Sequence, residues 1–213
     1  MCVITPQTKK ERVYQQIRKA ILSGELKAGE ILKEGELAER YGVGKTPTRE
    51  ALIVLSHEKF LEPMPRVGYI VGKPSIRDVL ETFHLRMLLE IEAIGIAAER
   101  IGEEEIRQLE QNNQAENQLA CHYCDNELKE KAYELNRDFH LIIAQASGNS
   151  RLAGTVRQLI DDMERMLSED PYLADPLQHM QMLESLKQRD RAAAQEAMRQ
   201  HLEETRSRLL NRF

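Results

Sequence analysis

The segment Thr46–Leu52 constrains the fold of this chain more than any other, because it combines two signals for the start of a helix. Thr46 can act as an N-cap, and Pro47 suits the first helical position, where the missing N–H has no intrahelical partner to lose. A shorter helical pattern over residues 36–41 stops at Gly42. Two short helices separated by a few residues predict a helix-turn-helix motif.

Flanking segments extend this pair of helices to a complete module. Thr8 and Glu11 have the spacing of a capping box at the start of an earlier amphipathic helix. After the second helix of the motif, residues 60–62 and 69–71 have strand-like patterns and flank a Pro- and Gly-containing turn over residues 63–68. The sequence therefore predicts three helices followed by a β-hairpin wing.

From Ser75 onward the pattern is almost continuously helical, after a break at residues 72–75. Ser75 and Asp78 can cap a long helix that continues to about Arg100, and no alternating pattern indicates a sheet. Further helices are predicted at about 103–121, 126–147, 150–168, 175–188 and 190–211. We therefore predict a mainly α protein, with a winged helix-turn-helix over residues 1–74 and an all-α six-helix bundle over residues 75–213.

The charge of the chain is divided unevenly between these two regions. Residues 1–74 contain 13 Lys and Arg against 9 Asp and Glu, whereas residues 75–213 contain 17 against 26. An electrostatic footprint for nucleic acid is local, so the acidic remainder does not argue against DNA binding by the basic region. The two regions are expected to have different functions.

Composition also bears on the cellular compartment. No run approaches the roughly 20 apolar residues of a membrane span, and the N-terminus lacks the basic start of a signal peptide. We therefore expect a cytoplasmic protein with no membrane partner. Cys121 and Cys124 have the spacing of metal ligands, but no second pair is available to complete a zinc site, so ordinary reduced thiols are favoured over zinc binding.

The order of the N-terminal motifs resembles the winged helix-turn-helix domain of the GntR family of bacterial transcription regulators. The segments that carry the resemblance are Gly24–Glu30, Glu36–Ala38, Thr46–Leu52 and Gly68–Val71. The resemblance implies that the major groove is read or positioned by Lys45, Thr46, Thr48 and Arg49, and that Arg66 and Gly68 place the wing at the DNA backbone or minor groove. The alternative is that Thr48 and Arg49 merely solvate a surface helix.

Two positions depart from the family pattern. Gly44–Lys45 stands where the family commonly has Ser-Arg, and Gly35 replaces an arginine that often contacts DNA. Lysine keeps the positive charge but loses the two-pronged reach of arginine to a guanine edge. The departure at Lys45 therefore bears on base preference.

Residues 75–213 resemble the ligand-binding FCD domain of the FadR subfamily, and six predicted helices favour the VanR-like variant over the seven-helix form. The matching residues are Arg86–Glu90, Asn136–His140, Ala146–Asn149, His179, Asp190, Ala193 and Met198–His201. By this resemblance, Asn136, His140, His179 and His201 would bind a divalent transition metal such as Zn, Ni or Mn. For the remaining histidines, ordinary core or surface roles are expected: His57, His84 and His122.

The first position of this metal set departs from the family, which usually has Asp where this chain has Asn136. Asn136 and His140 are four residues apart and share one helical face. A neutral amide oxygen is a weaker donor than a carboxylate, so we expect a lower metal affinity. A metal-free site that binds its effector directly is the alternative.

Arg86 precedes Glu90 by four residues, and two interpretations of it remain open. The spacing is that of a surface ion pair on a helix. The resemblance implies instead that Arg86 faces a cavity and binds the carboxylate of a small organic acid, for which its planar fork is suited. Candidate walls of that cavity are Phe83, Met87 and Phe139.

Together these features predict a DNA-binding transcription regulator that responds to a small carboxylate effector, most often a repressor in this family. Because a two-fold protein reads a palindromic operator, we expect a homodimer assembled through the acidic helical region. One alternative is a metal-dependent hydrolase built on the helical bundle. Another is a constitutive DNA binder in which the helical region is purely structural.

Overall fold

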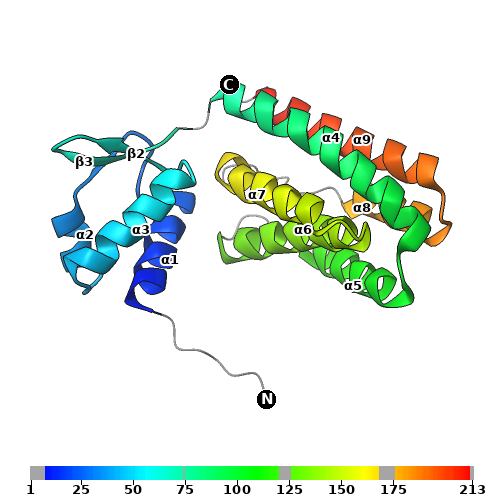
Figure 1. Cartoon of the computed structure of the whole chain (residues 1–213), viewed down its shortest axis with the longest axis horizontal. Coiled ribbons are helices and arrows are strands. Elements are labelled where there is room, and N and C mark those ends of the chain that lie inside the picture. Colours follow the sequence, from blue (N-terminus) through cyan, green and yellow to red (C-terminus); the bar gives the residue numbers. More distant parts are fainter. Residues whose placement is uncertain (1–7, 74, 120–125, 168–175, 212–213) are drawn as a thin grey trace, which may run out of the picture. The chain divides into compact units, whose positions relative to one another are not determined.

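The computed structural model describes residues 8–73, 75–119, 126–167 and 176–211. By its internal contacts the chain divides into two compact units, Met1–Pro74 and Ser75–Phe213. The first unit combines three helices with a small sheet, and the second is helical (Figure 1). Within the described ranges, no helix has the length and apolar character needed to cross a bilayer.

The elements of the first unit follow in the order predicted for a winged helix-turn-helix. They are α1 (Lys9–Leu22), β1 (Ile31–Leu32), α2 (Glu34–Arg40), α3 (Lys45–His57), β2 (Leu61–Met64) and β3 (Gly68–Val71). The predicted capping box is confirmed, because the Thr8 hydroxyl accepts from Glu11 N–H while the Glu11 carboxylate accepts from Thr8 N–H. The helices pack their apolar faces around a common core: Val13, Ile17, Leu37, Ala51, Leu52 and Leu55.

Two local predictions for this unit need correction, and one strand was missed. Helix α3 begins at Lys45, one residue before Thr46, and its N-cap is Gly44. Pro47 therefore occupies the third helical position, where its missing N–H still removes no intrahelical bond. Pro63 lies within β2 and not in the turn, which its place on an edge strand permits because the strand order is β1-β3-β2. The two-residue strand β1 was not predicted, and it pairs antiparallel with β3.

The second unit contains six helices among its described residues. They are α4 (Ile76–Arg100), α5 (Glu103–Leu119), α6 (Asn126–Ala146), α7 (Ser150–Leu167), α8 (Pro176–Lys187) and α9 (Arg191–Leu210). Each begins and ends within two residues of its predicted bounds. A capping box formed by Ser75 and Asp78 begins α4, and Asp190 caps α9 by accepting from Ala193 N–H.

Packing in this unit brings together helices that are far apart in the sequence. Helix α4 lies beside α9 and also contacts α6 and α7, while α5 contacts α6 and α8 (Figure 1). Large side chains fill the space between them: Val79, Phe83, Ile94, Leu109, Phe139, Ile143, Ile160 and Met163. This core surrounds a group of buried polar side chains, among them Arg86, Glu90, Glu116, Asn136 and the three histidines of the predicted metal set.

Candidate functional site

The first turn of α3 presents a basic surface. Lys45, Thr46 and Arg49 are exposed there. The Arg49 guanidinium contacts the Glu34 carboxylate of α2, with an Nη2 to Oε2 distance of 3.0 Å. Its side chain is nevertheless 65% exposed, so the pair holds the guanidinium on the surface without covering it.

Thr48 does not fit the predicted role in DNA contact. Its side chain is fully buried, and its hydroxyl donates to Gly44 O at 3.0 Å. A buried side chain that bonds its own helix cannot also reach a base edge or a phosphate. Thr48 instead stabilises the start of α3, and neither DNA contact nor surface solvation describes its position.

The predicted wing residues lie around the turn between β2 and β3. Arg66 is exposed and has a positive φ of 66°. Gly68 lies against the backbone of β1, where an added Cβ would come within 2.2 Å of Leu32 O. Glycine at this position is therefore required for the close approach of β3 to β1.

Gly35, at the start of α2, has no such constraint. A Cβ added to it would meet nothing within 4 Å, and its backbone has no unusual φ. An arginine at this exposed position would fit without displacing a neighbour. The arginine that the family pattern places there is thus missing for no steric reason.

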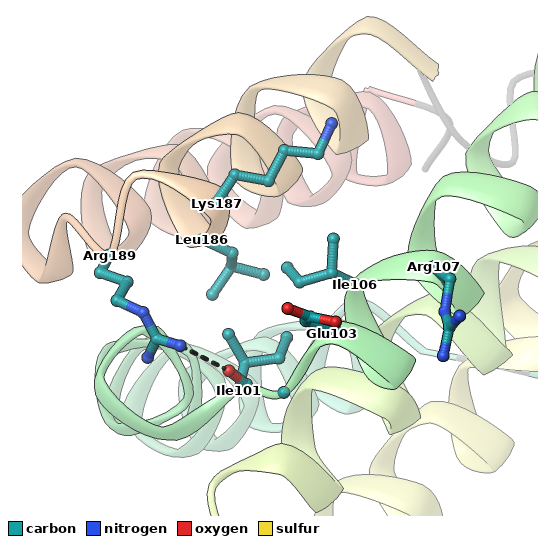
Figure 2. Close-up of a pocket in the computed structure, with 8 residues that line it drawn as sticks. Ile101, Glu103, Ile106, Arg107, Leu186, Lys187 and Arg189 are labelled. Atoms are coloured by element: carbon teal, nitrogen blue, oxygen red, sulfur yellow. Dashed lines mark hydrogen bonds between the residues drawn. The ribbon is translucent and has the colours of Figure 1, made fainter.

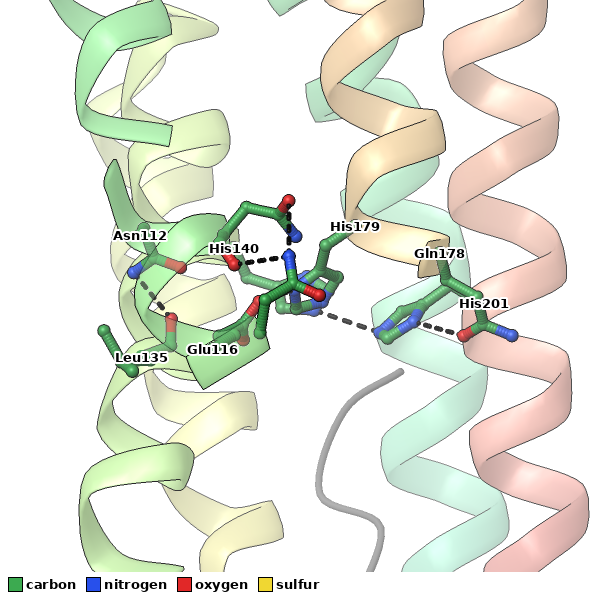
Figure 3. A network of polar contacts seen from close by, with 9 residues as sticks. Asn112, Glu116, Leu135, His140, Gln178, His179 and His201 are labelled. Atoms are coloured by element: carbon green, nitrogen blue, oxygen red, sulfur yellow. Dashed lines mark hydrogen bonds and ion pairs between the residues drawn. The ribbon is translucent and has the colours of Figure 1, made fainter. Parts of the chain in front are cut away.

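In the second unit, the three predicted histidines converge from different helices. His140 lies on α6, His179 on α8 and His201 on α9, and all three are buried (Figure 3). One ring nitrogen from each lies within 4.8 Å of the others, and the His140 Nε2 to His201 Nε2 distance is 3.2 Å. The His179 ring stacks on Phe139 with a centroid distance of 4.1 Å.

The Nδ1 atom of each histidine forms a hydrogen bond with a neighbouring side chain. The His140 Nδ1 is 2.5 Å from Glu90 Oε2, and the His179 Nδ1 is 2.7 Å from Glu116 Oε2. The His201 Nδ1 is 2.9 Å from Gln178 Oε1 (Figure 3). The Gln178 amide nitrogen donates to the Glu204 carboxylate, which directs the amide oxygen toward His201. All three partners are acceptors, so each Nδ1 carries the hydrogen and each neutral ring keeps its lone pair on Nε2.

The positions of these lone pairs indicate whether the residues can bind a metal ion. Two lone pairs 3.2 Å apart, on His140 and His201, repel each other unless a cation lies between them. The His179 Nε2 is buried and has no hydrogen-bond partner. Three imidazole rings with one nitrogen each within 4.8 Å of the others, and with an acceptor at each Nδ1, match the donor set of a transition-metal site. The residues therefore fit a divalent transition metal.

Burial also keeps two of the rings neutral. It lowers the pKa of His140, an effect that the Glu90 carboxylate opposes, and it lowers the pKa of His201 well below the ordinary value. The neighbouring His179 and His140 rings and the positive charge of Arg86 lower the His201 pKa further. Neutral imidazole is the form that binds a metal.

Asn136 is buried on α6, one turn before His140 and on the same helical face. This position is compatible with a fourth donor to the histidine centre. Of the predicted cavity walls, Phe83 and Phe139 are fully buried and Met87 is partly buried.

Arg86 forms the i,i+4 ion pair with Glu90 that its spacing suggested, but the pair is buried and not on the surface. Its side chain is 3% exposed, and its Nε donates to Glu90 Oε1 at 2.6 Å. Glu90 thus bridges Arg86 and His140. The Nη2 of Arg86 is buried without a hydrogen-bond partner, and such a group requires a ligand acceptor or carries a desolvation cost.

Three functional side chains were missed from the sequence: Glu90 as a histidine partner, Glu116 and Gln178. The sequence carried a signal only for Glu90, which belongs to the matching segment Arg86–Glu90. Glu116 lies on α5, 63 positions from its partner His179.

A separate open cavity of about 380 Å³ lies where the α4–α5 and α8–α9 connections meet (Figure 2). Its lining combines apolar and charged side chains: Ile101, Glu103, Ile106, Arg107, Leu186, Lys187 and Arg189. Arg189 donates to Ile101 O at 3.1 Å, and Lys187 and Arg107 pair with glutamates. None of the predicted site residues lines this cavity.

Among the described residues, the site contains no histidine besides His140, His179 and His201. His57 and His84 are exposed. The predictions for His122 and for the Cys121 and Cys124 thiols lie outside the described residues.

Comparison with known families gives two matches that together span most of the chain. The family described as "Bacterial regulatory proteins, gntR family" matches residues 9–71, and "FCD domain" matches residues 81–204.

Curated relatives and solved structures resemble the chain over nearly its full length. The uncharacterized HTH-type transcriptional regulator YdhC of Bacillus subtilis (strain 168) is 28% identical, over 88% of this chain and 85% of its own. The HTH-type transcriptional repressor RspR of Escherichia coli (strain K12) is also 28% identical, over 91% and 86%. The solved structure of E. coli McbR/YncC has a TM-score of 0.76 at 22% identity, over 97% and 99% of the two chains, which supports the fold alone.

Proposed function

Because the chain belongs to the GntR family of bacterial regulators and carries an FCD domain, we propose that it is a repressor whose DNA binding responds to a small organic acid. Its relatives are transcription regulators and not enzymes, so the hydrolase alternative is set aside. RspR and GlaR of E. coli (strain K12) are named as transcriptional repressors, which supports repression as the function of this chain. The proposal includes action in the cytoplasm.

In this proposal residues 1–74 bind DNA through the start of α3. Lys45, Thr46 and Arg49 meet the major groove, and Arg66 on the wing meets the backbone or minor groove. Their exposure supports this assignment, as does the excess of basic residues in residues 1–74. Thr48 and Gly68 then act indirectly, by holding the helix start and the wing.

Residues 75–213 bind the effector at the histidine centre. The observation that carries this part of the proposal is the convergence of three buried histidines, one ring nitrogen of each within 4.8 Å of the others, with an acceptor at every Nδ1. A divalent transition metal held by His140, His179 and His201, with Asn136, would supply a Lewis-acidic centre for a carboxylate oxygen. Arg86, whose buried Nη2 has no partner, would receive a carboxylate as well.

The effector acts in this proposal by changing the population of DNA-competent arrangements. A homodimer that reads a palindromic operator needs both recognition helices at the half-site spacing. An effector that binds one arrangement of the dimer more tightly shifts the equilibrium toward it, by as much as its affinities for the two arrangements differ.

Metal analysis of the purified protein tests the site. Protein that has not met a chelator should contain close to one transition-metal ion per chain by mass spectrometry, and His140→Ala should remove it. Asn136→Asp should strengthen retention, because a charged oxygen replaces a neutral one in a side chain of equal length. Occupancy should fall below about pH 6 as protons compete for the ring nitrogens.

Thermal shifts with a panel of organic acids, recorded with and without metal, test the effector. A carboxylate that stabilises the protein only when metal is present supports the complete proposal. A response in metal-free wild type would contradict the metal-bridged mechanism and favour direct binding. No response to any acid would favour a constitutive DNA binder.

A further inference from the structure

Glu116 occupies an unusual position behind the histidine centre. Its side chain is 2% exposed, and Oε2 lies 2.7 Å from the His179 Nδ1. The second carboxylate oxygen, Oε1, is buried and has no hydrogen-bond partner. A buried carboxylate left half unsatisfied is costly unless positive charge lies nearby.

Glu90 also backs a histidine, but its charge is balanced by Arg86, whose Nε lies 2.6 Å away. Among the described residues, no lysine or arginine forms an ion pair with Glu116, and His179 is its one ionisable partner. Of these two carboxylates, Glu90 has a neighbouring cation, whereas Glu116 has none among the described residues.

The four proposed donors contribute no charge of their own. Asn136 is a neutral amide, and the imidazoles are neutral when their Nε2 atoms act as donors. A site of four neutral donors leaves the full double charge of a divalent cation in a buried region. An anion close behind one of the donors would offset part of that charge.

On the basis of the metal site proposed above, we propose that Glu116 is a positioning residue that supplies, from behind His179, the negative charge that Asn136 lacks. The hydrogen bond from Nδ1 to the carboxylate fixes the tautomer of His179 and raises the basicity of Nε2. Hydrogen-bond partners behind metal-bound histidines typically alter metal affinity by about 10- to 100-fold. In this chain the effect should depend on which residue stands at position 136.

A double-mutant cycle with Zn²⁺ tests this dependence. The affinity for Zn²⁺ is measured by competition with a chromogenic chelator in wild type, Glu116→Gln, Asn136→Asp and the double variant. Glutamine keeps the acceptor for Nδ1 and removes only the charge. We expect Glu116→Gln to weaken Zn²⁺ binding about 10- to 100-fold. The same change should cost clearly less when Asn136→Asp is present, because position 136 then supplies an anion.

Glu110→Gln is the matched control, because Glu110 lies on the same helix α5, is 45% exposed and pairs with Lys187. It should leave the Zn²⁺ affinity unchanged. Equal affinities for Glu116→Gln and Glu110→Gln would overturn the inference while leaving the metal site intact. Equal losses with Asn and with Asp at position 136 would also overturn it. Failure of the wild type to bind Zn²⁺ would instead overturn the proposed metal site itself.

Long-range ¹H–¹⁵N spectra of the metal-free protein separate charge from geometry. His179 should carry its hydrogen on Nδ1 in both wild type and Glu116→Gln, since either side chain can accept it. An altered tautomer in Glu116→Gln would mean that weaker binding comes from lost orientation, which would overturn the charge proposal.

Discussion

Replacing Arg86 by Met should destabilise the helical unit far more than the loss of an exposed i,i+4 ion pair would. Arg86 and Glu90 form an i,i+4 pair on α4, and such pairs contribute little when exposed. Here both side chains are almost completely buried. Methionine fills much of the same space but leaves the Glu90 carboxylate without its cation. An uncompensated buried charge is the main cost of this substitution.

The pKa of Glu90 sets the size of the effect. Burial raises its pKa, but Arg86 and His140 together outweigh burial and lower the pKa from 4.5 to about 2. At about 1.4 kcal/mol per pH unit, this change favours the ionised carboxyl by about 3 kcal/mol. Removing one partner of a buried pair typically costs about 3–5 kcal/mol. We therefore expect Arg86→Met to lower the free energy of unfolding by about 3 kcal/mol at pH 7, and Tm by about 10 °C.

The same pKa determines how the effect depends on pH. The folded-state pKa of Glu90 lies below the unfolded value, so the unfolded chain takes up the proton first as the pH falls. The stabilisation is complete above about pH 4.5 and is lost between about pH 4.5 and pH 2. Below about pH 4.5, the difference in free energy of unfolding between wild type and variant should shrink by about 1.4 kcal/mol per pH unit.

Urea denaturation of chelator-treated protein, followed by circular dichroism at pH 7 and about pH 3.5, measures both quantities. Arg77→Met is the matched control, because Arg77 pairs with Glu81 at the same spacing on α4 but is 85% exposed. The double variant Arg86→Met/Glu90→Gln should recover much of the lost stability, since glutamine carries no charge and still accepts from His140. A loss no larger than that of Arg77→Met, or one that is the same at both pH values, would refute the reasoning.

Three further predictions concern DNA binding. Arg49→Ala should weaken operator binding about 5- to 100-fold by fluorescence anisotropy with little change on random DNA, whereas equal losses on both would indicate a phosphate contact. Gly35→Arg should be accommodated without strain and should steepen the dependence of log affinity on log salt by about one, so an unchanged slope would count against a DNA contact at this position. Light scattering should give a dimer for the whole chain, and a fragment of residues 1–74 should bind operator far more weakly; a monomer with full operator affinity would contradict the two-fold model.

Local sequence signals determined the order and bounds of most helices. The Thr8–Glu11 and Ser75–Asp78 capping boxes depend on residues three apart, so they could be identified without knowledge of the fold, and both are confirmed. Apolar periodicity likewise predicted the helical pattern of residues 75–213. Strand β1 could not be predicted in this way, because a segment of two residues has no periodicity. It is defined by its pairing with β3, in which Ile31 lies opposite Ile70, a residue far away in the sequence.

Burial and hydrogen-bond partners were decided by tertiary structure alone. The sequence left Arg86 equally compatible with a surface and a cavity, and it suggested that Thr48 faces DNA, whereas packing buries both side chains. Family resemblance indicated His140, His179 and His201 but not the residues behind them. Glu116 reaches His179 only because α5 packs against α8. A partner of this kind determines which nitrogen of a histidine is free to bind a metal. Sequence spacing does not specify how two helices pack, so it could not predict this contact.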